Sequence, residues 1–223
     1  MLLSLEKKFL FVHVAKAAGS SIRTTLDPYC VQPQQSWVNR FLDRIGIHVN
    51  HVGPFPRQWF RTHDTARTAQ FWLPRHVFDG VFKFAFVRNP WDRMVSMYSY
   101  ILLNTDHHRH GAVSQLEGFE DFLKTEFRRR VPLQLDSVSD RRGNVIVDFI
   151  GRFETLEADM AEVCRRIGIE YRLVHRNRAP HEPYQKSYNH RTRKLVADYF
   201  ARDIEYFGYD FEGFSRSHRP QAA

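Results

Sequence analysis

The chain has only two cysteines among its 223 residues, Cys30 and Cys164. A small secreted scaffold built on disulfides is therefore excluded, and a reducing, cytoplasmic location is expected. The chain also lacks an apolar run of about 18 residues, which a membrane-spanning helix needs. Residues 1–8 have no basic segment ahead of an apolar core, so no signal peptide is expected either. We expect no transmembrane segment in this chain.

Internal repeats and low-complexity segments are also missing, which favours one domain over residues 1–223. No metal site is expected, because His48 and His51 have a plausible spacing but no cysteine or carboxylate to complete the ligand set. The order GxxxxGK[ST], in which a lysine follows the glycines, does not occur. The familiar phosphate loop of ATP-dependent kinases is thus not present in its usual form.

What the chain does have is positive charge. Its formal net charge is +8 and its pI is near 9.7, while 43% of its residues are hydrophobic. This composition predicts a folded protein with an anionic partner such as a nucleotide, an acidic glycan, a nucleic acid or a membrane surface. No nucleic-acid partner is expected, because aromatic residues are not interleaved with the basic ones as they are in single-strand binders. No pattern indicates an oligomeric state.

Strand and helix patterns alternate along the chain, which predicts an α/β fold with a parallel sheet flanked by helices. The strand patterns run from Phe9 towards Lys16 and cover residues 48–52, 81–87 and 145–150. The helix patterns begin at Ser20 and Pro90 and cover residues 32–44, 65–73, 119–127, 156–167 and 192–206. Residues 107–111 are expected to form a polar loop.

The first candidate anion site follows the strand that begins at Phe9. Lys16 ends that strand, small residues form a turn through Gly19, and Ser20 and Ser21 open a helix. The first backbone N–H groups of a helix have no partner within it, and the positive end of the helix dipole lies there. The lysine charge and the two hydroxyls suit the same ligand. This stretch predicts a phosphate or sulfate site.

A second candidate anion site follows the strand at residues 81–87. Arg88 ends the strand, Asn89 and Pro90 suit the first positions of a helix, and Ser96 lies two turns further on. Asn89, Asp92, Arg93 and Ser96 are expected on one face of that helix. Ligands of open α/β sheets bind beyond the carboxyl ends of the strands, where both sites would lie. Two such sites suit a nucleotide that is phosphorylated at two places.

Four segments, in order, resemble the PAPS-dependent carbohydrate sulfotransferases, the Golgi-type and bacterial sulfotransferase family 2. VHVAKAAGSS at residues 12–21 resembles their 5′-phosphosulfate loop, and FAFVRNPWDRMVS at residues 84–96 their 3′-phosphate motif. VDFIGRFE at 147–154 and ARDIEYFGY at 201–209 look like further family segments. Ala15 and Ala17 depart from the Pro and Thr of many relatives. The resemblance implies a P-loop-like fold, and a Golgi-lumenal location only for a chain whose anchor has been removed.

The resemblance also implies an activity. The sulfuryl group of 3′-phosphoadenosine 5′-phosphosulfate (PAPS) would move to a carbohydrate hydroxyl by in-line displacement, without a metal. Lys16 would neutralise the leaving oxygen. By the same resemblance, the donor contacts fall on Lys16, Ala18, Gly19, Ser20 and Ser21 for the phosphosulfate, and on Arg88 and Ser96 for the 3′-phosphate.

The acceptor hydroxyl needs a general base, for which we expect His63. Its segment, RTHDTAR at residues 61–67, resembles a basic-His-x-Thr-Ala stretch of related sulfotransferases, and a histidine titrates near neutral pH. His63 could instead only pack at the start of the next helix. His51 and a carboxylate such as Glu154 remain as other bases. His51, Arg152 and Lys186 are further candidates for substrate contact.

Two other function classes stay open at this point. An ATP-dependent small-molecule kinase with an unusual phosphate loop would need magnesium and would bind ATP. A non-catalytic module that binds polyanions would show a steep salt dependence and ignore the nucleotide.

Overall fold

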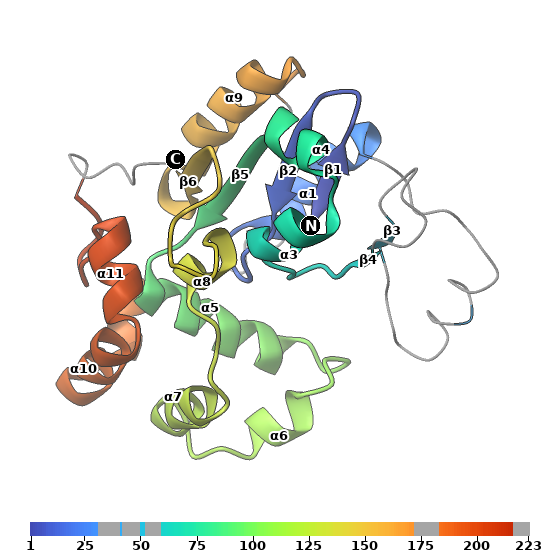
Figure 1. The fold of residues 1–223 in the computed structure, drawn as a ribbon. Coiled ribbons are helices and arrows are strands. Elements are labelled where there is room, and N and C mark those ends of the chain that lie inside the picture. The colour runs from blue at the N-terminus through green and yellow to red at the C-terminus, as the bar shows by residue number, and fades with distance from the viewer. Residues whose placement is uncertain (31–40, 42–49, 52–58, 172–182, 216–223) are drawn as a thin grey trace. The chain divides into compact units, whose positions relative to one another are not determined.

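The computed structural model describes residues 1–30, 41, 50–51, 59–171 and 183–215 (Figure 1). The chain forms two compact units, residues 1–87 with 136–176 and residues 88–135 with 177–221. The expectation of one domain over residues 1–223 stays a prediction. The predicted helix at 32–44 lies outside the described residues except for residue 41.

The first unit is built on a four-stranded sheet with the order β1-β2-β5-β6. β2 pairs in parallel with β5, and β5 with β6, as the predicted α/β class requires. β1 pairs antiparallel with β2, which the expected parallel sheet did not include. The strands are β1 (Leu2–Ser4), β2 (Phe9–Val12), β5 (Phe82–Val87) and β6 (Phe149–Arg152), with β3 (Asn50–His51) and β4 (Trp59–Phe60) as a separate antiparallel pair.

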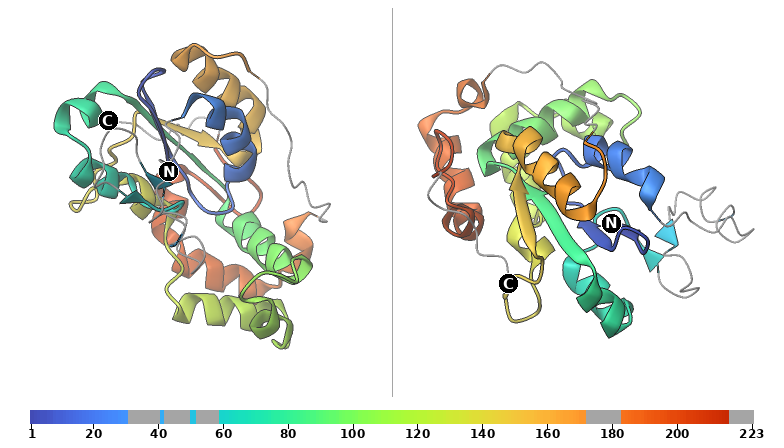
Figure 2. Two further views of the ribbon diagram at one scale, coloured as in Figure 1. Left: turned by 90° about the vertical axis from the view of Figure 1, so that its right-hand side faces the viewer. Right: turned by 90° about the horizontal axis from the view of Figure 1, so that it is seen from above.

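Helices and short 3₁₀ turns connect these strands. α9 shows why the sequence folds this way: Met160, Val163, Cys164 and Ile167 are buried at helical spacing, and Gly168 ends the helix in the left-handed conformation. Figure 2 shows α9 beside β6. The elements of this unit are α1 (Gly19–Leu26), η1 (Asp27–Tyr29), α3 (Ala66–Trp72), α4 (Arg75–Gly80), η2 (Phe153–Thr155) and α9 (Leu156–Ile167).

β6 begins later than the predicted strand at residues 145–150 and runs on to Arg152. Val145 instead forms an isolated antiparallel bridge with Ser139. Asp148 accepts a hydrogen bond from the backbone N–H of Lys83 (2.6 Å) and also pairs with the Lys83 ammonium (2.9 Å). The side chain of Asp148 thus fixes where the parallel pairing starts, and residue patterning does not reveal that contact.

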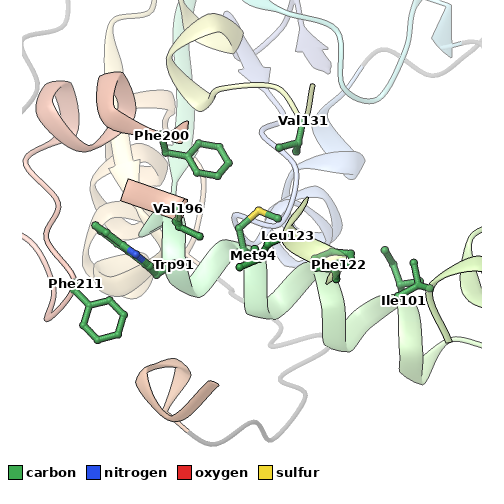
Figure 3. Packing of buried hydrophobic residues seen from close by; sticks show 10 residues of the cluster. Trp91, Met94, Ile101, Phe122, Leu123, Val131, Val196, Phe200 and Phe211 are labelled. Atoms are coloured by element: carbon green, nitrogen blue, oxygen red, sulfur yellow. The ribbon is translucent and has the colours of Figure 1, made fainter. Parts of the chain in front are cut away.

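The second unit is helical, and its helices bury a common apolar core (Figure 3). Met94 of α5, Phe122 of α7 and Phe200 are each fully buried there. The unit contains α5 (Pro90–Leu103), α6 (His110–Ser114), α7 (Phe119–Arg128), η3 (Tyr184–Ser187), α10 (His190–Tyr199) and α11 (Ala201–Phe207). α8 (Gln134–Val138) carries the chain back into the first unit.

Two predictions in the second unit are corrected. The helix expected over residues 192–206 is two helices, because the chain bends at Phe200, whose ring is fully buried in the core. The polar loop expected at 107–111 ends early, since His110 begins α6 and its Nδ1 lies 3.0 Å from the carbonyl oxygen of Ile101.

Candidate active site

The turn between β2 and α1 has an unusual backbone. Lys16 (φ 67°) and Ala18 (φ 62°) both adopt the left-handed conformation, although neither is glycine. Such residues each cost about 1–3 kcal/mol and tend to occur where the backbone is shaped for a ligand. Ala17 between them is buried, and its N–H donates to the carbonyl of Val14 (3.4 Å). Two strained residues within three positions make this turn the first candidate for a ligand site.

No side chain caps the N-terminus of α1. The helix begins after Ala18, which has no side-chain oxygen, so the N-cap side chain does not satisfy the first N–H groups, those of Gly19 and Ser20. Of the two expected hydroxyls, Ser20 is exposed and Ser21 is buried, 5% exposed. Lys16 is half-buried in the same turn. The residues predicted to hold the phosphosulfate therefore lie on one turn. Ser20 supplies the exposed hydroxyl among them.

His13 packs directly against this turn. Its ring stacks on Phe11 at 5.8 Å, and a methyl group placed on Gly19 would overlap its imidazole. Burial, with a smaller contribution from the neighbouring His63, lowers the pKa of His13 to about 3. His13 is therefore neutral at physiological pH, and glycine is required at position 19 because the imidazole fills the space of a side chain.

Substitution of Gly19 tests this packing. Gly19→Ala is expected to destabilise the protein by about 1–3 kcal/mol, because the new methyl group displaces the His13 ring. The cost should shrink in a His13→Ala background, where the ring is gone. Urea unfolding of the wild type, both single variants and the double variant measures this coupling. Equal costs of Gly19→Ala in the two backgrounds would refute the contact.

The low pKa of His13 predicts a pH-dependent stability. The unfolded chain protonates this histidine near pH 6.5, whereas the folded chain does so only near pH 3. Stability from the neutral imidazole is thus complete above pH 6.5 and is lost as the pH falls towards 3. Between pH 7 and pH 5 the wild type should lose roughly 2 kcal/mol more free energy of unfolding than His13→Gln. Parallel pH profiles for the two proteins would contradict the assignment.

His63 lies beside the same turn, in the first unit. Its Nδ1 is 3.3 Å from the backbone carbonyl oxygen of His13, and the two rings are 4.6 Å apart. The side chain is exposed, although it stands before α3, whose N-cap is Thr65. If Nδ1 carries the proton and donates to the carbonyl, Nε2 is the unprotonated nitrogen of the ring. The expected base thus lies next to the residue that packs on Gly19.

Arg88 comes directly after β5, in the second unit. Its side chain is 4% exposed, and its Nε donates to the carboxylate of Asp92 at 2.7 Å. Asn89 caps α5 by accepting from the N–H of Trp91 (3.1 Å), and Pro90 is the first helical residue, as predicted. Ser96 is half-buried two turns along the same helix. Asp92 therefore fixes the direction of the Arg88 side chain.

The remaining residues that the sequence singles out each have contacts of their own. Arg93 does not share the surroundings of Arg88, because it donates to the carbonyl of Pro132 (3.1 Å) and lies over the ring of Phe200. Arg152 ends β6 and is 6% exposed, and its N–H donates to Asp159 (2.8 Å). Lys186 is exposed on η3. His51 lies in β3, and its side chain is outside the described part. The contacts of these residues with substrate stay predictions.

The described residues lack two further features. No three side chains of His, Cys, Asp or Glu gather there as a metal ion would need. In the same residues, no helix is both long enough and apolar enough to cross a membrane.

Comparison with known proteins identifies the family. A model of the sulfotransferase family matches residues 1–210. The chain belongs to the sulfotransferase family. An uncharacterized protein of Archaeoglobus fulgidus is 36% identical over 116 residues, which are 50% of this chain and 89% of that protein. The resemblance drawn from four sequence segments is thereby confirmed.

A solved structure extends the likeness to the fold. The crystal structure of mouse sulfotransferase SULT7A1 complexed with PAP matches with a TM-score of 0.53 and 13% sequence identity, over 91% of this chain and 86% of that chain. At this identity the match concerns the fold alone, and it confirms the predicted α/β sulfotransferase fold. The strained turn after β2 and the arginine after β5 are thus features of a sulfotransferase chain.

Sequence reasoning missed several residues that shape this sulfotransferase site. His13 lies at the end of an apolar strand pattern, and its ring fills the space that a side chain at position 19 would need. No sequence pattern indicates Gln134, although its side chain forms hydrogen bonds with the backbone of Arg88. Asp203 lies in a segment that resembles the family, but no role was predicted for it. Family resemblance could have drawn attention to Asp203, whereas no local signal points to Gln134.

Proposed function

We propose that this sulfotransferase moves the sulfuryl group of PAPS to a hydroxyl of a carbohydrate acceptor by in-line displacement. One observation carries the proposal. In the first unit, the half-buried Lys16, the uncapped N-terminus of α1 and the exposed His63 converge on a single turn, through the packing of His13 on Gly19. A positive charge, free N–H donors and a base are what this reaction requires.

The turn after β2 suits the phosphosulfate end of the donor. PAPS, when bound, supplies a sulfuryl group on a phosphate leaving group. The N–H groups of Gly19 and Ser20 and the Ser20 hydroxyl donate to its oxygens, and Lys16 neutralises the charge that gathers on the leaving oxygen. The neighbour SULT7A1 was crystallised with PAP, which supports a nucleotide donor of this kind.

The second candidate anion site suits the 3′-phosphate of the donor. Arg88 carries a guanidinium, a group that can bind two phosphate oxygens at once, and Ser96 of α5 adds a hydroxyl. The ion pair with Asp92 holds the Arg88 side chain in place before the nucleotide binds. We therefore assign Arg88 and Ser96 to the 3′-phosphate.

His63 acts as the general base in this proposal. In the tautomer whose Nδ1–H donates to the carbonyl of His13, Nε2 is the basic nitrogen that takes the proton of the acceptor hydroxyl. The acceptor oxygen then bonds to sulfur while the bond between sulfur and the bridging oxygen breaks. The proton remains on His63, and the electrons of the broken bond go to the phosphate beside Lys16.

A cleft in the first unit supports an acidic carbohydrate as acceptor. It has a volume of about 360 Å³, and its lining combines guanidinium groups with an exposed aromatic ring, as sugar carboxylates or sulfates and a sugar face would require. Part of the lining belongs to α3, which starts three residues after His63. The lining residues are Arg67, Gln70, Phe71, Asp140, Arg141 and Arg142.

Incubation with ³⁵S-labelled PAPS and a panel of acidic and neutral glycans tests the proposal. We expect label on acidic glycans, no loss of activity with EDTA, and no phosphate transfer from ATP with magnesium. Transfer of phosphate from ATP would favour the kinase instead. Binding of polyanions with no use of either nucleotide would favour a non-catalytic module.

A further inference from the structure

The backbone of Arg88 is held by a side chain distant in sequence. The Arg88 N–H donates to Oε1 of Gln134 (2.9 Å), and Nε2 of Gln134 donates to the Arg88 carbonyl (2.8 Å). Gln134 is fully buried. The amide side chain of Gln134 thus satisfies both the backbone N–H and the backbone carbonyl of Arg88. A neighbouring β-strand would satisfy these groups in the same way.

Gln134 is held in turn by a buried carboxylate. Asp203 of α11 accepts hydrogen bonds from the N–H groups of Gln134 (2.8 Å) and Leu135 (3.0 Å). Asp203 is 0% exposed. A buried charge is tolerated only when it is well hydrogen-bonded, so these two bonds fix the start of α8 firmly against α11.

The location of Arg88 explains why such support matters. Arg88 stands between the last residue of β5 and Asn89, the N-cap of α5, so neither the strand nor the helix contains it. Its guanidinium is directed by Asp92 and its peptide groups by Gln134. Backbone and side chain are therefore fixed by different residues, which reduces the ordering cost when a ligand binds.

We propose that Gln134, anchored by Asp203, is a positioning residue that holds Arg88 ready for the 3′-phosphate of the donor nucleotide. The proposal rests on the function assigned above and adds two residues that are fully buried. All of its contacts lie within the second unit.

The test compares binding of adenosine 3′,5′-bisphosphate with that of adenosine 5′-phosphate, which lacks the 3′-phosphate. Gln134→Glu keeps the size of the side chain but places an oxygen against the Arg88 carbonyl. We expect at least about tenfold weaker binding of the bisphosphate, equivalent to one hydrogen bond to a charged group, and little change for adenosine 5′-phosphate. The KM for PAPS should rise in parallel, with kcat at saturation unchanged.

Two further variants keep the test decisive. Asp203→Asn preserves shape and should weaken bisphosphate binding in the same direction. Tyr199→Phe removes another hydrogen bond of this unit, from the Tyr199 hydroxyl to the Val131 carbonyl (2.8 Å), and should leave the preference for the bisphosphate intact. The new carboxyl of Gln134→Glu gains an O–H donor for the Arg88 carbonyl when it is protonated. As the pH is lowered, the affinity of this variant for the bisphosphate should therefore approach that of the wild type measured at the same pH.

The outcomes separate this proposal from the function on which it rests. If the wild type itself binds the two nucleotides equally, the 3′-phosphate assignment fails. If the wild type and Arg88→Ala differ as expected but Gln134→Glu and Asp203→Asn both keep full preference for the bisphosphate, only the positioning role is overturned. The positioning role is also overturned if Tyr199→Phe loses as much of the preference for the bisphosphate as Gln134→Glu does. General destabilisation of the unit would then explain both results.

Discussion

Lys16→Ala is expected to lower kcat for sulfuryl transfer by about 10²–10³-fold, the usual effect of removing one group that stabilises charge in the transition state. Lys16 lies in the strained turn after β2, where the leaving oxygen is proposed to develop its charge. Binding of the product nucleotide should weaken less than kcat falls, because charge on that oxygen is greatest during the reaction. Single-turnover rates at saturating PAPS separate the two effects.

Lys8 provides a matched control for this prediction. It is also a lysine with a left-handed backbone (φ 50°), and it is exposed in the turn between β1 and β2. Alanine has the same backbone restriction as lysine, so neither substitution relieves strain, and Lys8→Ala should retain full activity. A Lys16→Ala enzyme with a rate close to that of Lys8→Ala would rule out the role given to Lys16.

His63→Ala is the second substitution with a large expected effect, a loss in kcat of about 10²–10⁴-fold. Donor binding should be nearly unchanged, because the Nδ1 of His63 lies against the His13 carbonyl and the proposed role of His63 concerns the acceptor, not the nucleotide. The variant would then bind adenosine 3′,5′-bisphosphate normally while failing to transfer sulfate. Calorimetry and radiolabel transfer on the same sample measure the two quantities.

His76 is the corresponding control, since it is an exposed histidine of the same unit, on α4. His76→Ala should have wild-type kcat. If His63→Ala also keeps wild-type kcat, the base has been assigned wrongly, and variants of His51 and Glu154 become the next to measure.

The parts of this fold that could be predicted are those set by adjacent residues. The apolar run at residues 82–87 forms β5, and Asn89 with Pro90 begins α5, because strand and cap signals act within a few positions. The helix over 156–167 is likewise defined by its buried stripe and by Gly168. Each of these predictions is confirmed.

The features that could not be predicted depend on partners distant in sequence. The start of β6 is set by the contact of Asp148 with Lys83, and the bend at Phe200 by burial of its ring. Gln134 meets Arg88 across 46 positions and Asp203 across 69. Patterns within a window of a few residues contain no information about such pairs.

The candidate site divides in the same way. The turn from Lys16 to Ser21 and the cap at Asn89 follow from local sequence. The left-handed backbone at Ala18 and the packing of His13 on Gly19 do not follow from local sequence. An alanine does not indicate a strained backbone, and a histidine does not indicate whether its ring is buried.

Titration of the wild-type protein with adenosine 3′,5′-bisphosphate in a calorimeter, beside adenosine 5′-phosphate, tests the account most directly. We predict saturable heat for one nucleotide per chain, and weaker binding of the nucleotide that lacks the 3′-phosphate. A folded sample that gives no heat with the bisphosphate would contradict the account.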